Sequence, residues 1–306
     1  MLTANGLRQR SEVLQAIRAF FFANGYIEVD TPVRLPVLLP ESHLIPFTGH
    51  GWFLQTSPEL CMKRLLARGC TRIFQICHCF RQEESGRLHQ PEFNMLEWYQ
   101  RGENYEYLMG QCEALLCHLH RTLPHLPGFA SPGFLCWNNC RISLTPPWER
   151  LTVAEAFRRY ADVEVDWALA RGLFDEILVT RIEGHLGRDR PVFLCDYPIE
   201  LGSLARGCRD NPTVAERFEL YVAGVELANG FSELVDVEEQ RQRFAGEIEK
   251  LRMEGREAVM PEAFMADLEK IGAAAGIALG LDRLVMLLLR SPSISEAIPF
   301  IFEELQ

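Results

Sequence analysis

The sequence predicts an α+β fold in which helices flank an antiparallel sheet. Two runs rich in β-forming residues, 71–81 and 93–99, are separated by a polar segment and indicate a long hairpin. A small-residue strand at 276–280 runs into an apolar helix over 282–289, which we expect to be buried. Near the N-terminus, apolar residues at helical spacing add an amphipathic helix.

The N-terminal helix is predicted to run for about 14 residues, from Ser11 as its cap to the Asn24-Gly25 pair. Its apolar positions are Val13, Ile17, Phe20 and Phe21. A strand at 26–30 follows and ends at a Thr-Pro pair, and a proline-rich loop then leads to a short strand at 51–55. The next helix, over 58–68, has an apolar side and a charged side that carries Lys63 and Arg64.

The second strand of the hairpin places four side chains on one face by its period of two. These are Phe93, Met95, Glu97 and Tyr99. After it we expect a helix over 105–119, a Pro/Gly-rich stretch over 124–147 and a strand near 191–197. A strand that begins at 218 is predicted to turn at the Asn229-Gly230 pair and to continue to 235, before a charged helix over 237–254.

Composition indicates a globular chain with a substantial core, because 48% of its 306 residues are hydrophobic. No stretch approaches the roughly 20 apolar residues of a membrane span, and the N-terminus lacks the apolar run of a signal peptide. We therefore expect a cytoplasmic protein that does not bind a membrane. The ten irregularly spaced cysteines are typical of reduced thiols. In Cys77-His78-Cys79 a strand would turn the histidine away from both cysteines, so no zinc site is expected.

The formal charge of −11 and the isoelectric point near 5.3 have the wrong sign for a surface dedicated to nucleic acid. A tRNA is therefore an improbable partner on charge alone.

Three sequence features follow one another in a distinctive order. A strand ending at a proline comes first, the segment 80–84 (FRQEE) then ends a strand before a polar loop and Phe93, and 280–283 (GLDR) begins a buried helix. Each is ordinary alone. In this order they resemble motifs 1, 2 and 3 of the class II aminoacyl-tRNA synthetases. The resemblance implies the catalytic fold of that class and an enzyme that uses ATP and Mg²⁺ to activate a carboxylate.

Within this class the sequence is most similar to lysyl-tRNA synthetases, and the similarity extends from Ser11 to about Phe300. The segments that carry it are 56–60 (TSPEL), 62–66 (MKRLL), 91–93 (PEF), 95–99 (MLEWY) and 226–234 (ELANGFSEL). The motif 1 helix begins almost at Met1, so we expect one catalytic domain, 1–306, without an anticodon-binding domain. The chain thus resembles a truncated paralogue of lysyl-tRNA synthetase that attaches (R)-β-lysine to elongation factor P.

The resemblance assigns the ATP site. A carboxylate is already ionised at neutral pH, so its attack on the α-phosphorus of ATP needs positioning and charge neutralisation more than a base. Arg81 suits the α-phosphate or the substrate carboxylate, and Arg283, at a helix start, suits the γ-phosphate. Glu226 and Glu233 are the expected Mg²⁺ ligands.

Phe93 would stack on adenine while Glu83 and Gln90 read its edge. Gln82, Leu227 and Gly280 complete the expected ATP site. Gln82 and Gln90 stand where the family more often has asparagine.

The amino acid is expected to be lysine-like. Glu97, Tyr99 and Glu233 would surround its ε-ammonium group, and Glu59 would hold its second amino group. Ser57, Asn229 and Ala278 complete the expected pocket. Alternatively, Glu59 is an acidic residue favoured by a helix N-terminus, and Glu97 is a structural ion-pair partner.

Ala278 stands where lysyl-tRNA synthetases typically have glycine. Its methyl group is expected to crowd the α-amino group of ordinary lysine, or else to pack the strand against the last helix.

Three hypotheses follow. The chain attaches β-lysine to elongation factor P, or it activates α-lysine, charging a tRNA or another acceptor, or it is an inactive paralogue that binds or regulates. The last is weakened by the retained set of Arg81, Glu83, Glu226, Glu233, Gly280 and Arg283. The negative charge and the expected lack of an anticodon-binding domain favour the first. The resemblance also implies a homodimer, with an exposed apolar face at Ile17, Phe20 and Phe21 as its natural interface.

Overall fold

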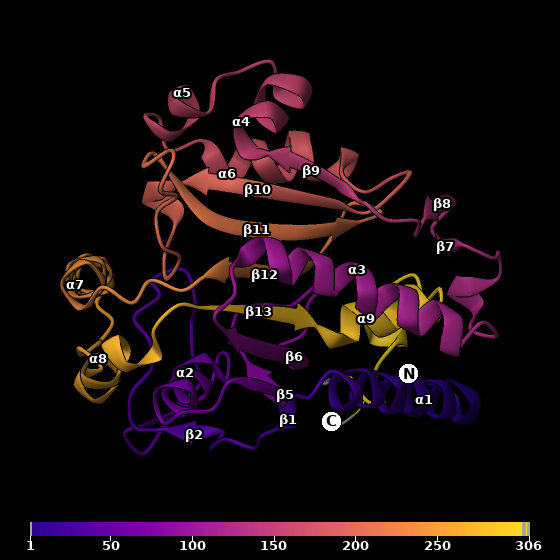
Figure 1. Ribbon diagram of the computed structural model, residues 1–306, viewed down its shortest axis with the longest axis horizontal. Coiled ribbons are helices and arrows are strands. Elements are labelled where there is room, and N and C mark those ends of the chain that lie inside the picture. Colours follow the sequence, from indigo (N-terminus) through magenta and orange to yellow (C-terminus); the bar gives the residue numbers. More distant parts are fainter. Residues whose placement is uncertain (1, 302–303, 305–306) are drawn as a thin grey trace.

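A large sheet organises the fold in the computed structural model, which describes residues 2–301 and 304 (Figure 1). Across these residues the sheet has eight strands, in the order β1-β5-β6-β13-β12-β11-β10-β9. Their bounds are Ile27–Glu28 (β1), Arg72–Phe80 (β5), Glu92–Arg101 (β6), Ala274–Gly280 (β13), Val225–Ser232 (β12), Val214–Val222 (β11), Val192–Pro198 (β10) and Glu149–Thr152 (β9). The six strands from β5 to β10 are antiparallel, and only the outermost strands, β1 and β9, run parallel to their neighbours. The predicted α+β class is therefore confirmed, with a sheet that is mixed at its two edges.

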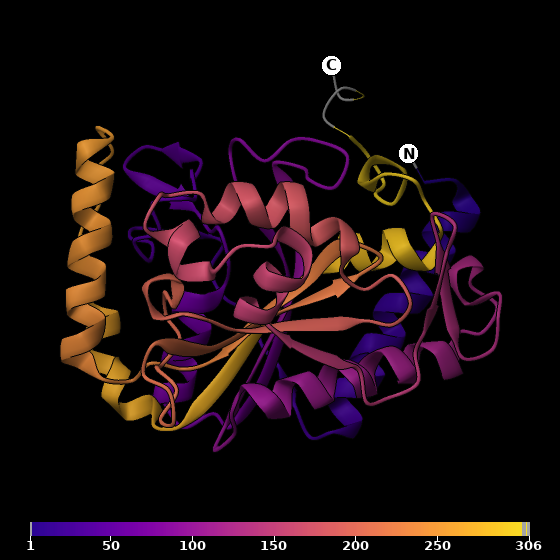
Figure 2. The ribbon, with the colours of Figure 1, turned by 90° about the horizontal axis from the view of Figure 1, so that it is seen from above.

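Helices cover the sheet and stand at its ends. Their bounds are Ala4–Ala23 (α1), Glu59–Ala67 (α2), Tyr105–Thr122 (α3), Val153–Ala156 (α4), Val165–Leu169 (α5), Phe174–Ile177 (α6), Val237–Met253 (α7), Glu262–Leu268 (α8) and Leu281–Leu288 (α9). Helix α7 stands at the end of the molecule opposite α1 (Figure 2). None of the helices within the described residues is long and apolar enough to cross a membrane.

Short strands complete the fold outside the main sheet. One small sheet contains Arg34–Leu35 (β2), Trp52–Leu54 (β4) and Thr48–Gly49 (β3), and a separate hairpin contains Phe134–Trp137 (β7) and Cys140–Ser143 (β8).

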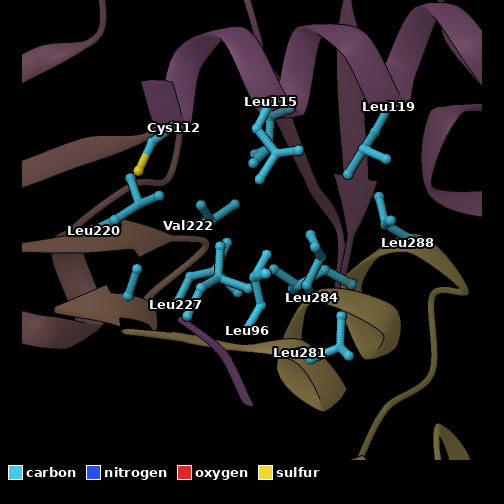
Figure 3. Close-up of a cluster of buried hydrophobic side chains, with 14 of the residues drawn as sticks. Leu96, Cys112, Leu115, Leu119, Leu220, Val222, Leu227, Leu281, Leu284 and Leu288 are labelled. Carbon is cyan, nitrogen blue, oxygen red and sulfur yellow. The ribbon is translucent and has the colours of Figure 1, made fainter. Parts of the chain in front are cut away.

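The main hydrophobic core lies between one face of the sheet and helices α1, α3 and α9. Figure 3 shows Leu115 of α3 and Leu284 of α9 meeting strand residues such as Leu96. Because side chains alternate along a strand, β6 sends Leu96 and Trp98 into this core and turns Glu97 to the opposite face. One face of the sheet is thus used for stability, and the other is free to form a site.

Helix α1 begins earlier than the sequence predicted. Thr3, not Ser11, is its cap, and the Thr3 Oγ1 atom accepts a hydrogen bond from the Gly6 backbone N–H at 3.2 Å. The early turns are stabilised by a distant partner, because the buried Arg10 forms an ion pair with Asp282 of α9 at 2.6 Å. A pairing across 272 residues leaves no local signal in the sequence.

The expected dimer interface is also corrected. Ile17, Phe20 and Phe21 are buried in the core of the chain itself, so they form no exposed face. The exposed apolar residues at this edge are instead Phe22, 53% exposed, and Ile27, 59% exposed.

The Asn229-Gly230 pair is not a turn. The hairpin turns at Ala223 and Gly224, whose φ angles of 57° and 76° suit a tight two-residue turn, and Asn229 and Gly230 lie inside β12. Gly230 is required by packing, since a Cβ atom there would lie 2.8 Å from the Phe218 ring. The glycine of the pair therefore reflects close contact between strands.

Candidate active site

A cavity of about 910 Å³ opens on the face of the sheet opposite the main core. Most of the site residues expected from the sequence line it: Ser57, Glu59, Arg81, Gln90, Phe93, Glu97, Tyr99, Glu226, Leu227, Asn229, Ala278, Gly280 and Arg283. They come from β6, β12 and β13 in the sheet and from segments that flank α2, β5 and α9. The leucine side chain of Leu227 packs in the core (Figure 3), so only its backbone is available to a ligand.

Three expected residues do not line the cavity. Gln82 and Glu83 are exposed, and the carboxylate of this loop that lines the cavity is Glu84. The Glu84 Oε1 atom accepts a hydrogen bond from Arg81 at 3.1 Å. The roles of Gln82 and Glu83 toward adenine remain predictions. Glu233 is 2% exposed and lies behind the cavity wall.

Arg81 lines the cavity and directly follows the end of strand β5. Its Nε atom donates to the Thr56 carbonyl at 3.3 Å, and its guanidinium carbon lies 5.2 Å from the centre of the Phe93 ring. Burial opposes the charge of Arg81, but nearby Glu84 and Glu41 raise its pKa further. The group is thus a fixed cation beside an aromatic platform.

Arg283 provides a second cation, held at the start of α9. Its Nη1 atom donates to the Glu226 backbone carbonyl at 2.7 Å and to the Glu226 carboxylate at 3.1 Å. Its neighbour Asp282 fixes the helix start by accepting hydrogen bonds from Arg10 at 2.6 Å and from the Asn94 N–H at 2.7 Å. Burial opposes ionisation of Glu226, yet Arg283, together with Arg81 and Arg217, outweighs it and lowers the pKa of that carboxyl.

Arg217 and Glu219 are cavity residues that the sequence reasoning missed. Arg217 donates to Glu219 Oε1 at 2.7 Å and to Asn229 Oδ1 at 3.1 Å. Tyr221, two residues along β11, donates to Glu219 Oε2 at 2.8 Å and is paired across the strands with Glu226. Glu219 and Glu226 therefore share one face of adjacent strands. Correct placement of the turn at Ala223-Gly224 would have revealed this pair.

The predicted Mg²⁺ pair of Glu226 and Glu233 is not brought together in the structure, and its role remains a prediction. Glu226 lies near the start of β12 and Glu233 directly follows its last residue, and seven residues of extended chain span roughly 23 Å. Glu219 and Glu226 are an alternative pair, because both line the cavity on adjacent strands. Burial raises the pKa of Glu219, Arg217 opposes this, and the negative charge of Glu226 adds to it. Two carboxylates that face a cavity suit Mg²⁺, which usually keeps water and phosphate oxygens as its other ligands.

A second part of the site consists of carboxylates around a buried lysine. Lys63 is 1% exposed, so its predicted place on a charged surface of α2 is wrong. Its Nζ atom lies 2.6 Å from Glu59 Oε1 and 2.5 Å from Glu233 Oε2, and 5.0 Å from the centre of the Phe231 ring. Two carboxylates thus compensate the buried ammonium group. Burial raises the pKa of Glu233 to about 8, although Lys63 opposes this.

Glu97 and Tyr99 form the cavity wall next to Lys63 and its two carboxylate partners. The Tyr99 hydroxyl donates to Glu97 Oε1 at 2.7 Å, and burial followed by the charge of Glu59 raises the pKa of Glu97 well above its ordinary value. Gly276 makes room for them, because a Cβ atom there would lie 2.1 Å from the Tyr99 ring and 2.7 Å from Glu233 Oε1. Glu97 Oε2 has no hydrogen-bond partner in the described part of the chain.

Glu41, in the loop before β3, is a further carboxylate that sequence reasoning missed. Burial and nearby Glu59 raise its pKa to about 7. The loop is fastened to distant segments, since Glu247 of α7 accepts hydrogen bonds from the N–H and the hydroxyl of Ser42, and Arg256 donates to two loop carbonyls. No local pattern marks Glu41, because its place depends on these contacts.

Ala278 lies in the middle of β13, paired with Glu97 on one side and Asn229 on the other. It is half-buried and lines the cavity, whereas its neighbours Ile277 and Leu279 belong to the main core. Its methyl group therefore faces the site rather than helix α9.

Comparison with known proteins identifies the family of the chain. The family model of class II tRNA synthetases (D, K and N) matches residues 3–303. The chain belongs to this family. Among curated proteins it is similar to proteins named elongation factor P--(R)-beta-lysine ligase. The one from Edwardsiella ictaluri is 38% identical over 312 residues, with 96% of this chain and 94% of the relative covered. Those from Salmonella gallinarum and Salmonella arizonae are 37% and 36% identical, with the same coverage.

Proposed function

We propose that this chain is an ATP-dependent ligase that activates (R)-β-lysine as its adenylate and transfers it to a lysine side chain of elongation factor P. The observation that carries the proposal is the polarity of one cavity. Cationic Arg81 and Arg283 line it, and carboxyl groups, including those of Glu59 and Glu233, gather around the buried Lys63. A molecule with phosphates and one with two ammonium groups could thus meet between them. The names of the relatives support the same amino acid and acceptor.

Charge balance supports a dicationic substrate. Four carboxyl groups, those of Glu41, Glu59, Glu97 and Glu233, lie around Lys63, and burial raises the pKa values of Glu41, Glu97 and Glu233. A ligand with two ammonium groups would stabilise the ionised forms of these buried carboxyls.

The chemistry has two steps. The substrate carboxylate attacks the α-phosphorus of ATP, which releases pyrophosphate and forms the mixed anhydride. The amino group of the acceptor lysine then attacks the activated carbonyl, which releases AMP and leaves an amide. In the proposed mechanism Arg81 and Arg283 hold the phosphate oxygens by charge-assisted hydrogen bonds. Glu219 and Glu226 would hold Mg²⁺, which neutralises phosphate charge when bound.

We further propose one catalytic domain that needs no tRNA and acts in the cytoplasm, where an elongation factor is found. The names of the relatives, which refer to elongation factor P, and the formal charge of −11 support the exclusion of tRNA.

The purified protein is expected to catalyse ATP–pyrophosphate exchange with (R)-β-lysine in the absence of RNA, because activation needs only the cavity. Mass spectrometry of elongation factor P after incubation should show one added β-lysyl group. Exchange that begins only when tRNA is added would contradict the proposal. Exchange with α-lysine but not with β-lysine would instead identify an α-lysine enzyme.

Replacing Ala278 with glycine is expected to shift preference from β-lysine toward α-lysine. The methyl group faces the cavity between Glu97 and Asn229, where it would crowd an α-amino group, while the amino group of β-lysine is one carbon farther along. One carbon in a tight pocket decides about 1–3 kcal/mol, or roughly 10- to 200-fold in the ratio of kcat/KM values. Exchange rates with both lysines measure this ratio.

Ala275→Gly is the matched control, because it adds a glycine to the same strand but removes a methyl group from the main core. The control should lower both rates together or leave them unchanged. A ratio that stays fixed in Ala278→Gly would show that the methyl group serves packing alone.

We also propose a homodimer through the edge formed by the end of α1 and by β1. Phe22 and Ile27 are exposed there, and β1 is the outermost strand of the sheet. Phe22→Glu with Ile27→Glu is expected to raise the dimer dissociation constant at least about tenfold, since two charges would have to be buried. Analytical ultracentrifugation measures this constant. Trp167→Glu, at an exposed position on α5, should leave it unchanged, and a monomeric wild-type protein would rule out the dimer.

A further inference from the structure

Three sulfur atoms lie together on the cavity face of the hairpin formed by β5 and β6. Cys77 and Cys79 point to the same side of β5, and their Sγ atoms are 4.0 Å apart. Met95 lies directly across from Cys77 on β6, and its Sδ atom is 3.9 Å from Cys79 Sγ. The proposed reaction uses none of these sulfurs.

The geometry disfavours two familiar uses of such cysteines. Residues two apart on a strand have Cα atoms roughly 6.6–6.8 Å apart, which is the upper limit for a disulfide. Zinc normally takes four ligands, but His78 is exposed on the opposite face. Within residues 2–301 and 304, no group of three His, Cys, Asp or Glu side chains could hold a metal. The geometry of Cys77 and Cys79 therefore suits neither a disulfide nor a zinc site.

The spacing of the two cysteine sulfurs matches a single soft ion. Two sulfurs that are each about 2.3 Å from a shared ion and subtend about 120° lie about 4.0 Å apart. Thiolates together with a thioether select soft cations, of which Cu(I) is the common biological one. We propose that Cys77, Cys79 and Met95 form a three-coordinate site for one Cu(I) ion, a function separate from the ligase chemistry. Binding would replace the protons of the two thiols.

The ion can reach these ligands from the cavity. Cys79 is fully buried, but Cys77 is half-buried, and Met95 lines the cavity wall. A site that is dry on one side and open to the cavity on the other protects a soft ion from water while still allowing it to enter.

The test is an anaerobic titration of the reduced full-length protein with Cu(I), in competition with the chromogenic chelator bathocuproine disulfonate. We expect one tightly bound ion per chain. Cys77→Ser and Cys79→Ser should each weaken binding about 100-fold or more, since each removes a thiolate. Met95→Leu, which nearly conserves volume, should weaken it about tenfold. Cys208→Ser removes a half-buried thiol elsewhere and should change nothing.

Copper X-ray absorption on the loaded protein should show about three sulfur neighbours at about 2.3 Å. Unchanged affinity in both Cys77→Ser and Cys79→Ser would overturn the proposal, because the ion would then be bound by other cysteines. A shell dominated by nitrogen or oxygen would overturn it as well. Melting temperatures of the variants, measured without copper, distinguish loss of the site from loss of the fold.

Discussion

Arg283→Ala is expected to lower the rate of ATP–pyrophosphate exchange by about 10²-fold or more. The guanidinium group is fixed before any ligand arrives, by the Glu226 carbonyl at 2.7 Å and the Leu88 carbonyl at 3.2 Å. A cation that needs no reorganisation stabilises developing phosphate charge most effectively, so its loss is expected to reduce kcat more than it affects KM. Steady-state exchange at varied ATP concentration separates the two.

The matched control is Arg252→Ala, which removes an exposed arginine from α7. Its rate should equal that of the wild type. Because Arg283 also contacts Glu226, thermal unfolding of both variants must be compared, and only a folded Arg283→Ala protein is informative. A folded variant with an unchanged exchange rate would show that the assignment of Arg283 to phosphate is wrong.

Lys63→Met is expected to lower the free energy of unfolding by about 3–5 kcal/mol, which is the usual cost of removing one partner of a buried ion pair. Methionine has a similar length, so little packing is lost. The penalty arises because ionised Glu233, 2% exposed and 2.5 Å from the lysine, would lose its compensating charge. Denaturant unfolding is therefore measured above the pKa of Glu233, which is about 8, where this carboxyl is ionised in the folded protein.

A double variant isolates the electrostatic part of this loss of stability. Lys63→Met combined with Glu233→Gln removes both charges and should recover most of the lost stability. Lys250→Met removes a lysine from a mainly exposed pair on α7 and should change stability by less than about 1 kcal/mol. If the single and double variants of the buried pair are equally unstable, the charge of Lys63 is not the reason for its burial.

Elements with strong local patterns were predicted well from the sequence. The hairpin of β5 and β6 and the β13–α9 junction agree with the structure within a few residues. The alternation along β6 also placed Glu97 and Tyr99 on one face, and the structure joins them by a hydrogen bond. Short-range periodicity is sufficient for such features because each is defined by its own residues.

Features that depend on distant residues were missed. The Asn229-Gly230 pair has the strongest local turn signal, yet contact with Phe218 places it within a strand. Lysine is usually found on the surface of a protein. Only the contact with Glu233, 170 positions later, explains why Lys63 is buried. Glu219 and Glu41 also depend on distant contacts. Strand pairing places Glu219 in the site, and the contacts that hold its loop place Glu41 there. Tertiary contacts decide such positions, and one sequence does not display them.

The position of β13 also has a consequence for how the chain folds. This strand, 274–280, lies between β6 and β12 near the middle of the sheet, although it follows both of them in the sequence. Until it emerges from the ribosome, β6 and β12 each have an unpaired edge that can pair with other chains. Arg10 likewise cannot form its ion pair until Asp282, 272 residues later, has been made. The cavity walls and the Arg283 cation therefore form together, so that a nascent chain has no complete cavity until β13 and α9 have been made.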